Sequence, residues 1–340
     1  MRVLGFLRDS DDKMDAVHYY RTYLPLREVH RHDNDIEAQC AGRTELAGAT
    51  DDELGGRDIY SMCRMYNDQY EPFIKQVHKE GGLFVFDSDD DRTETYKMVS
   101  GRGDEFKEVL GVADYVTCST PTVAKLFGQY TQRPPTVLGN RIDVDWMQET
   151  AARGRRLVEG LTLGFSGSPT HWGDWYIPAV PFSRIGIDYP DVTLVLHGET
   201  PRYLSYAEEK ASVLKLGGVP FSNYPILLNQ FDILLCSVNC ADEFNSGKSN
   251  VKALEAMALG VVPICSRFKP YLELKEAGAP IIVVDEDTRD GWYEAMKWLI
   301  EHDQERRRRS ILGPIWVKEH MDMNTGGYKQ WQDFYNEIAN

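Results

Sequence analysis

Residues 243–266, EFNSGKSNVKALEAMALGVVPICS, combine small polar groups with a lysine and a lone acid in a helical pattern. The spacing of the apolar residues predicts a helix over residues 249–259. Four residues stand at the start of this helix: Gly247, Lys248, Ser249 and Asn250. Backbone N–H groups at a helix N-terminus attract anions, and the ammonium group of Lys248 adds a positive charge. The segment therefore predicts a site for a diphosphate.

Glu255 is the acid within this predicted helix and lies six residues after Ser249. On the inward side of the helix its carboxylate can accept hydrogen bonds from both hydroxyls of a ribose. The combination indicates a nucleotide that carries a sugar or a second group. The alternative is a core helix capped by Ser249, with Leu254, Met257 and Ala258 buried.

Two other phosphate-binding patterns are disfavoured. The pattern GxxxxGK[ST] requires a glycine at position 242, where this chain has Asp242. No GxGxxG pattern follows the first strand-like run. P-loop kinases and dinucleotide-dependent oxidoreductases are therefore disfavoured as classes.

Two series of short strand-like runs must position these residues. The first series is RVLGFL (2–7), DIYSMC (58–63), GGLFVFD (81–87), DYVTCS (114–119) and TVLGN (136–140). The second series is LTLGFSG (161–167), VTLVLHG (192–198), DILLCS (232–237), VVPICS (261–266) and IIVVDED (281–287). Helix-patterned segments separate the runs, which is typical of parallel sheets with helices on both faces. We therefore expect an α/β fold with two doubly wound, Rossmann-like domains.

The restart of this pattern places a domain boundary between the two series. We expect an N-terminal domain over residues 1–145 and a C-terminal domain over residues 158–320. Residues 321–340 are predicted to form a helix that packs back on the N-terminal domain. The apolar stripe of this helix comprises Trp331, Phe334, Tyr335 and Ile338. Ligands of such sheets bind at the carboxyl ends of the strands, so we expect the site in a cleft between two facing domains.

An acidic cluster overlaps the end of the third run of the first series. Its four carboxylates are Asp87, Asp89, Asp90 and Asp91. Asp87 and Asp89 are predicted to line the active site on the side of the acceptor. Two alternatives remain open, namely a divalent cation site and a solvated loop that caps the following helix.

Further candidates follow the strand-like runs, where a ligand cleft is expected. Tyr20 and Arg21 are predicted on the acceptor side; alternatively the tyrosine packs in the core and Arg21 pairs with an acid. His171, in the loop 164–174, is predicted to contact the leaving phosphate or the sugar, with a purely structural role as the alternative. Asn140 is predicted to form a turn that sets a hinge, with a ligand contact as the alternative.

Several segments together resemble the GT-B glycosyltransferases, in particular the retaining family 4 and its branch with the motif FN-x-GKSN-x-K-x-LE. Besides this motif, the resemblance lies in VHYYRTYLPL (17–26), FVFDSDDD (84–91), ADYVTCSTPTVAKLF (113–127), VLGNRIDVDW (137–146), LGFSGSPTHWGDW (163–175) and NQFDILLCS (229–237). The resemblance implies a GT-B fold. It also implies the transfer of a sugar from a UDP- or GDP-sugar to a hydroxyl of a saccharide, a lipid-linked sugar or a protein.

The resemblance implies roles for individual residues. The catalytic candidates are Lys248, Asp87 and His171. The donor-binding candidates are Gly247, Ser249, Asn250, Glu255 and Ser168. The acceptor-side candidates are Tyr20, Arg21 and Asp89, and no metal or cofactor is expected. Most family members carry two glutamates spaced E-x7-E; the second matches Glu255, whereas the first falls on Gly247.

Charge bears on the choice of acceptor. Lys and Arg number 38 against 53 Asp and Glu, and the resulting net charge of −15 repels phosphate backbones. Modified DNA, the acceptor of some viral enzymes of related fold, is therefore an alternative that would depend on a small patch formed by Arg153, Arg155 and Arg156. A non-catalytic nucleotide or sugar binder is a further alternative, supported by the missing first glutamate.

The cysteines and the N-terminus bear on location. Six cysteines form no CxxC pair, which is typical of a reducing compartment. The N-terminal apolar run is too short for a signal peptide, and no run of about 18 apolar residues is present. A cytoplasmic protein is therefore expected.

Overall fold

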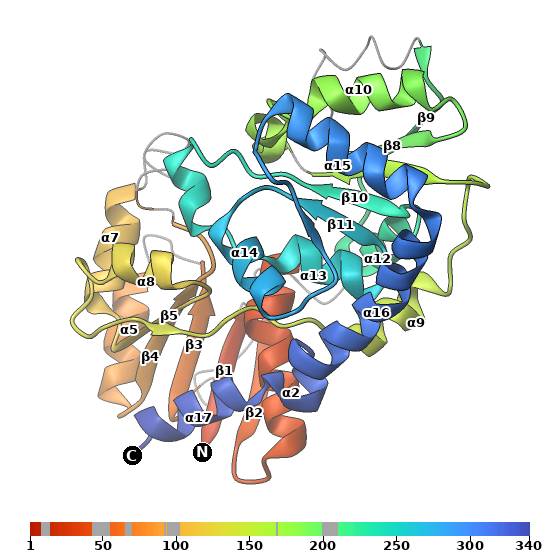
Figure 1. Cartoon of the computed structure of the whole chain (residues 1–340). Coiled ribbons are helices and arrows are strands. Elements are labelled where there is room, and N and C mark those ends of the chain that lie inside the picture. Colours follow the sequence, from red (N-terminus) through yellow and green to blue (C-terminus); the bar gives the residue numbers. More distant parts are fainter. Residues whose placement is uncertain are drawn as a thin grey trace. The chain divides into compact units, whose positions relative to one another are not determined.

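The computed structural model describes residues 1–7, 14–42, 55–64, 70–91, 93, 103–167, 169–198 and 210–340. The chain divides into two compact units (Figure 1). Unit 1 consists of Met1–Arg141, Ser246–Ser249 and Met323–Asn340, and unit 2 consists of Ile142–Asn245 and Asn250–Asp322. Each unit contains a six-stranded sheet, and the strands pair in parallel. The prediction of an α/β fold with two domains built on parallel sheets is confirmed.

The sheet of unit 1 has the strand order β2-β1-β3-β4-β5-β6. Its strands are β1 (Arg2–Leu7), β2 (Glu37–Gly42), β3 (Ile59–Cys63), β4 (Leu83–Ser88), β5 (Tyr115–Cys118) and β6 (Thr136–Val137). The central strands β1, β3 and β4 are almost entirely buried, because helices cover both faces of a parallel sheet. Strand β4 ends in Asp87 and Ser88, which brings a carboxylate to the carboxyl edge of this sheet.

The helices of unit 1 surround this sheet. They are α1 (Ala16–His18), the π-helical turn η2 (Tyr19–Tyr23), α2 (Leu24–His32), α5 (Tyr70–Lys79), α7 (Gly103–Val112), α8 (Pro121–Phe127), the π-helical turn η7 (Met323–Gly327) and α17 (Lys329–Ile338). Thr120 begins α8 by accepting a hydrogen bond from the N–H of Val123. The apolar stripe of α17 is buried, and this helix packs against α2 (Figure 1). The end of the chain is therefore part of unit 1.

The sheet of unit 2 has the strand order β12-β11-β10-β7-β8-β9. Its strands are β7 (Thr162–Ser166), β8 (Thr193–His197), β9 (Val213–Leu216), β10 (Ile233–Cys236), β11 (Val262–Cys265) and β12 (Ile282–Val283). Strand β7 can lie this close to β8 only because position 164 is a glycine. A Cβ on Gly164 would lie 1.9 Å from the carbonyl oxygen of Val195.

The helices of unit 2 include the predicted donor helix, α13. They are α9 (Val144–Ala151), the 3-10 helix η3 (Pro169–Trp175), α10 (Ala179–Asp188), the 3-10 turn η5 (Phe221–Asn223), α12 (Tyr224–Leu228), α13 (Val251–Ala258), α14 (Lys269–Glu276), α15 (Arg289–Glu301) and α16 (Asp303–His320). The 3-10 turn η6 (Glu243–Gly247) precedes α13. Helix α16 crosses α13 at Gly313, where a Cβ would lie 2.9 Å from the carbonyl oxygen of Met257. Within the described ranges, no helix has both the length and the apolar character needed to cross a membrane.

Candidate active site

The loop Ser246–Ser249, which precedes α13, belongs to unit 1 and is held there by hydrogen bonds. Thr120 Oγ1 donates a hydrogen bond to the carbonyl oxygen of Gly247 over 3.2 Å. Asn140 Nδ2 donates to Ser249 Oγ over 2.9 Å. Gly247 is buried, and a Cβ there would lie 3.0 Å from a side-chain carbon of α8. Lys248, which lies between the two anchored residues, is partly exposed.

The N-terminus of α13 has no side-chain cap. The helix begins at Val251, and its N-cap residue Asn250 makes no side-chain capping hydrogen bond. The N–H groups of Ala253 and Leu254 donate to the carbonyl oxygen of Asn250 over 3.0 and 3.2 Å. Ser249 therefore does not cap the helix, whereas Leu254, Met257 and Ala258 are buried, as the alternative of a core helix predicted. The N–H groups that precede the first helical hydrogen bonds are those that an anion can use.

Glu255 is a buried carboxylate on α13, with 5% of its surface exposed. Burial, and secondly the negative charge of Glu255, raise the pKa of Tyr224 well above its ordinary value. The Tyr224 hydroxyl in turn lies 3.2 Å from Oγ of Ser166, the last residue of β7. Glu255 is therefore near the carboxyl end of β7, where parallel sheets bind their ligands.

Lys252, the second lysine of the motif FN-x-GKSN-x-K-x-LE, supplies a positive charge and was not among the predicted site residues. Its Nζ lies 4.8 Å from the ring centre of Phe165, a favourable distance for a cation over an aromatic face. Burial, and secondly the charge of Lys252, lower the pKa of His197 to about 4. His197 is therefore neutral near pH 7, and its Nδ1 lies 2.8 Å from Ser166 Oγ. The signal in the sequence was the spacing of Lys252 and Glu255, which are three residues apart and hence neighbours on one helix.

His171 is held in a defined orientation by Asp174. Nδ1 of His171 lies 2.7 Å from Oδ2 of Asp174, and Oδ1 of this carboxylate accepts from the N–H of Asn239 and from Nδ2 of Asn245 over 2.9 and 3.0 Å. Because the buried carboxylate accepts a hydrogen bond from Nδ1, this nitrogen carries the proton and Nε2 is the acceptor nitrogen of the neutral ring. Ser168, predicted to bind the donor from the same loop, lies outside the described residues.

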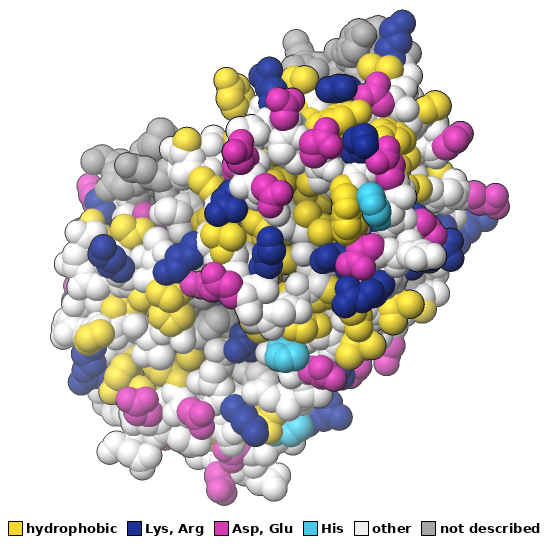
Figure 2. Space-filling view, in the orientation of Figure 1, with side chains coloured by type: hydrophobic (Ala, Val, Ile, Leu, Met, Phe, Trp, Pro, Cys, Tyr) yellow, Lys and Arg dark blue, Asp and Glu magenta, His cyan; other side chains and the backbone are white. Residues whose placement is uncertain are grey.

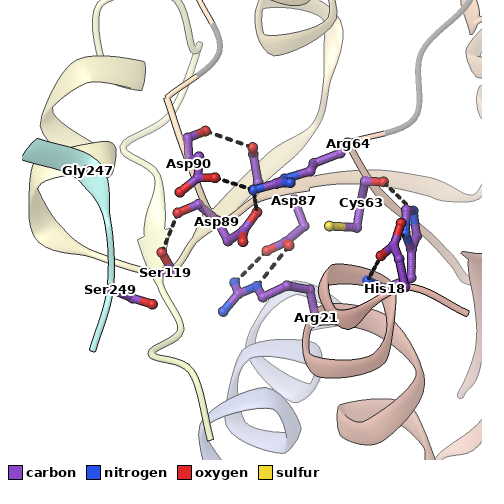
Figure 3. Close-up of polar contacts among 12 residues, drawn as sticks. His18, Arg21, Cys63, Arg64, Asp87, Asp89, Asp90, Ser119, Gly247 and Ser249 are labelled. Carbon is purple, nitrogen blue, oxygen red and sulfur yellow. Dashed lines mark hydrogen bonds and ion pairs between the residues drawn. The ribbon is translucent and has the colours of Figure 1, made fainter. Parts of the chain in front are cut away.

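Arg21 and Asp87 form a buried ion pair in unit 1 (Figure 3). Nε and Nη2 of Arg21 donate to the Asp87 carboxylate over 3.0 and 2.6 Å, and Thr117 Oγ1 donates to the same carboxylate over 2.6 Å. This pairing is the alternative that the sequence left open for Arg21. Tyr20 is also buried, with its ring edge-on to that of Tyr19 at 5.3 Å between ring centres. Asp87 has no exposed surface, and its three hydrogen bonds favour an orienting role over direct contact with an acceptor.

Two further carboxylates of the acidic cluster, those of Asp89 and Asp90, contact Nη2 of Arg64 (Figure 3), whereas Asp91 accepts hydrogen bonds from the N–H and the hydroxyl of Thr93. Ser119 Oγ donates to the backbone carbonyl of Asp89 over 2.7 Å. Burial raises the pKa of Asp89 to about 6; the charge of Arg64 opposes this rise, and that of Asp90 reinforces it. In the part of the chain that the structure describes, no group of three or more His, Cys, Asp or Glu side chains could hold a metal ion.

Comparison with known proteins identifies the class of unit 2. Residues 161–302 match the family model described as Glycosyl transferases group 1. This segment contains His171, Lys252 and Glu255. The chain therefore carries a glycosyltransferase domain, and the predicted enzyme class is confirmed. A search of curated proteins found no match.

Solved structures share the fold over almost the whole chain. Alr3699/HepE of Anabaena, in complex with UDP and glucose, has a TM-score of 0.66 at 13% identity, and the match covers 99% of this chain and 100% of that chain. Sucrose-phosphate synthase of Thermosynechococcus elongatus has a TM-score of 0.68 at 11% identity, and 99% of each chain is covered. The α,α-trehalose 6-phosphate synthase of Burkholderia multivorans has a TM-score of 0.59 at 12% identity, with 99% of this chain and 96% of that chain covered. At these identities the likeness shows the fold alone, which is GT-B as predicted.

Proposed function

We propose that this chain transfers a sugar from a UDP- or GDP-sugar to a hydroxyl group, with retention of the anomeric configuration. The observation that carries the proposal is the position of Lys252 and Glu255 on α13. A buried carboxylate and a lysine lie three residues apart, on a helix whose N-terminus has no side-chain cap. The UDP and glucose bound to Alr3699/HepE support the choice of donor class.

The donor contacts follow from this geometry. Glu255 accepts hydrogen bonds from the ribose hydroxyls, because a carboxylate offers acceptors only. The diphosphate lies against the loop of Gly247, Lys248, Ser249 and Asn250 and against the first N–H groups of α13. Lys252, four positions after Lys248 in the sequence, adds a second cation for the diphosphate.

In the proposed reaction the acceptor oxygen bonds to the anomeric carbon on the face from which the phosphate leaves. The bond between this carbon and the phosphate oxygen breaks, and the proton of the acceptor hydroxyl passes to the departing phosphate oxygen. Negative charge builds up on the leaving diphosphate. The two lysines and the N–H groups of α13 stabilise this charge, and in many enzymes such electrostatic stabilisation contributes more to the rate than any other effect. His171 presents Nε2 to the sugar or to the leaving phosphate, and Asp174 holds its orientation.

The proposed acceptor is a saccharide, a lipid-linked sugar or a protein. On the face shown in Figure 2, Lys and Arg side chains are interspersed with Asp and Glu side chains. Together with the net charge of −15, this pattern disfavours DNA as the acceptor. The six cysteines are unpaired in the structure, which supports the proposal of a cytoplasmic location.

Calorimetric titration with UDP and GDP tests the donor site. Glu255→Ala should cost about 2–4 kcal/mol of binding free energy for the preferred nucleotide, because charge-assisted hydrogen bonds to both ribose hydroxyls are lost. Glu255→Gln keeps the shape and one acceptor and should cost less. Glu273→Gln, at an exposed glutamate of α14, is the matched control.

Two results would refute the donor site. Either the wild type binds neither nucleotide, or Glu255→Ala binds as tightly as the wild type. Helix α13 would then be a core helix without a ligand. Hydrolysis or transfer of sugar from a panel of sugar nucleotides separates an enzyme from a non-catalytic binder, because a binder releases no nucleoside diphosphate.

A further inference from the structure

The Arg21 guanidinium is fixed from several directions within unit 1. Besides its two bonds to Asp87, its Nη1 donates to the backbone carbonyl of Leu138 and to Oδ1 of Asn140, the latter over 3.1 Å. The guanidinium also lies over the ring of Trp331, at 4.9 Å from the ring centre. With 1% of its surface exposed, Arg21 cannot reach a substrate and acts only on its neighbours.

The bond from Arg21 determines which way the Asn140 side chain faces. A guanidinium has donors only, so the amide oxygen of Asn140 must face Arg21. The amide NH2 therefore faces Ser249 and donates to its hydroxyl oxygen over 2.9 Å. Because the Ser249 hydroxyl accepts this bond, its own proton is directed away from Asn140 and can be donated to another group.

We propose that Arg21 and Asn140 are positioning residues that hold Ser249 as a hydrogen-bond donor for the diphosphate of the donor substrate. The inference rests on the proposed function, because Ser249 belongs to the loop assigned to the diphosphate. An anion accepts hydrogen bonds from donors. Because the Ser249 oxygen already accepts a hydrogen bond from Asn140, the Ser249 hydroxyl can donate its proton to the diphosphate. Asp87 contributes indirectly, because its carboxylate holds the Arg21 guanidinium in place.

The network joins parts of unit 1 that are far apart in the sequence. Arg21 comes from η2, directly after α1, whereas Asn140 follows β6 and Ser249 precedes α13. Figure 3 shows Arg21 against Asp87, with Ser249 on the adjoining loop. Residues that do not touch the donor thus set the direction of a hydrogen bond at the donor loop.

The test is Asn140→Asp. The new carboxylate still accepts from Arg21, but its second oxygen cannot donate, so the Ser249 hydroxyl must turn to donate to it. Affinity for UDP should fall about tenfold, since one hydrogen bond to a charged group is lost. Affinity for uridine, which has no phosphate, and the melting temperature should change little. Asn34→Asp, at an exposed asparagine of unit 1, is the matched control for the added charge.

A double-mutant cycle that combines Asn140→Asp with Ser249→Ala distinguishes two causes of weaker UDP binding. One is the reorientation of the Ser249 hydroxyl, and the other is direct repulsion between the new carboxylate and the diphosphate. If Asn140 acts through the Ser249 hydroxyl, the double variant should bind UDP no more weakly than Ser249→Ala alone. Additive losses, or equal losses for UDP and uridine, would overturn the inference. So would an Asn140→Asp variant that binds UDP as tightly as the wild type. If the wild type binds no nucleoside diphosphate, the proposed function fails and this inference fails with it.

Discussion

Replacing Lys252 with methionine removes one positive charge from the first turn of α13. Methionine is unbranched and can still lie over the Phe165 ring, where the lysine Nζ lies 4.8 Å from the ring centre. The packing of the helix should therefore survive, and the change isolates the charge. Two quantities should respond, namely the pKa of His197 and the affinity for a diphosphate.

The pKa of His197 should rise from about 4 but stay below its ordinary value of 6.5, because burial is the larger cause of its depression and Lys252 the smaller. Affinity for UDP should fall by about 1.5–3 kcal/mol, which corresponds to roughly 10- to 150-fold, as expected for a hydrogen bond to a charged group. Affinity for uridine should change by less than about threefold, because uridine has no charge to meet the ammonium group.

Nuclear magnetic resonance of the histidine ring protons against pH measures the first quantity, and calorimetry measures the second. Lys269→Met on α14, where the lysine side chain is 74% exposed, is the matched control. The reasoning is refuted if UDP and uridine lose affinity equally, or if the pKa of His197 does not move.

The free energy of unfolding, measured against pH, also responds to the charge of Lys252. His197 binds its proton less readily in the folded chain, so its contribution to the free energy of unfolding is at full value above pH 6.5 and falls as the pH drops toward 4. Lys252→Met should weaken this acid sensitivity, measured by urea unfolding between these two pH values.

Two more residues yield predictions of different kinds. Asp174→Asn should lower kcat at least about tenfold while the affinity for UDP changes less, because the amide no longer holds His171 in the required tautomer. Steady-state kinetics measure this effect, with Asp191→Asn at an exposed position as the control. An unchanged kcat in Asp174→Asn would contradict the prediction. Asp89→Asn should change the dependence of stability on pH. The pKa of Asp89 is raised from 3.8 to about 6, so its stabilising contribution is at full value below pH 3.8 and is lost as the pH rises through 6. The variant should therefore gain stability relative to the wild type across this range in urea unfolding, and parallel curves would contradict the assignment.

The fold was largely predictable because the buried strands are apolar runs with helical segments between them. Strands β2 (EAQCAG) and β9 (VLKL) were not predicted, and both lie at the edges of their sheets. An edge strand has one neighbour and one side open to solvent, so its sequence can alternate or carry charge, although apolar runs did predict the other two edge strands, β6 and β12. In β2, exposed Glu37 and Gln39 flank buried Ala38, a pattern too short to distinguish from a loop.

The candidate site was predictable only where the spacing along one element carried the information. Glu255 could be singled out because an acid on the apolar face of a helix is unusual. Lys252 was missed because a lysine on a helix is ordinarily solvated, and only the structure places it beside Phe165 and His197. The pairing of Arg21 with Asp87 spans 66 positions, and no local pattern connects the two residues.

The inclusion of Met323–Asn340 in unit 1 has a consequence for the order in which the chain acquires its structure during synthesis. A ribosome releases the N-terminal part first, and domains generally fold as they emerge. Here the ring of Trp331, which covers the Arg21 guanidinium, emerges after all of unit 2. Unit 1 thus starts to be synthesised first and is completed last. The ion pair between Arg21 and Asp87 therefore lacks the cover of the Trp331 ring until α17 has been synthesised.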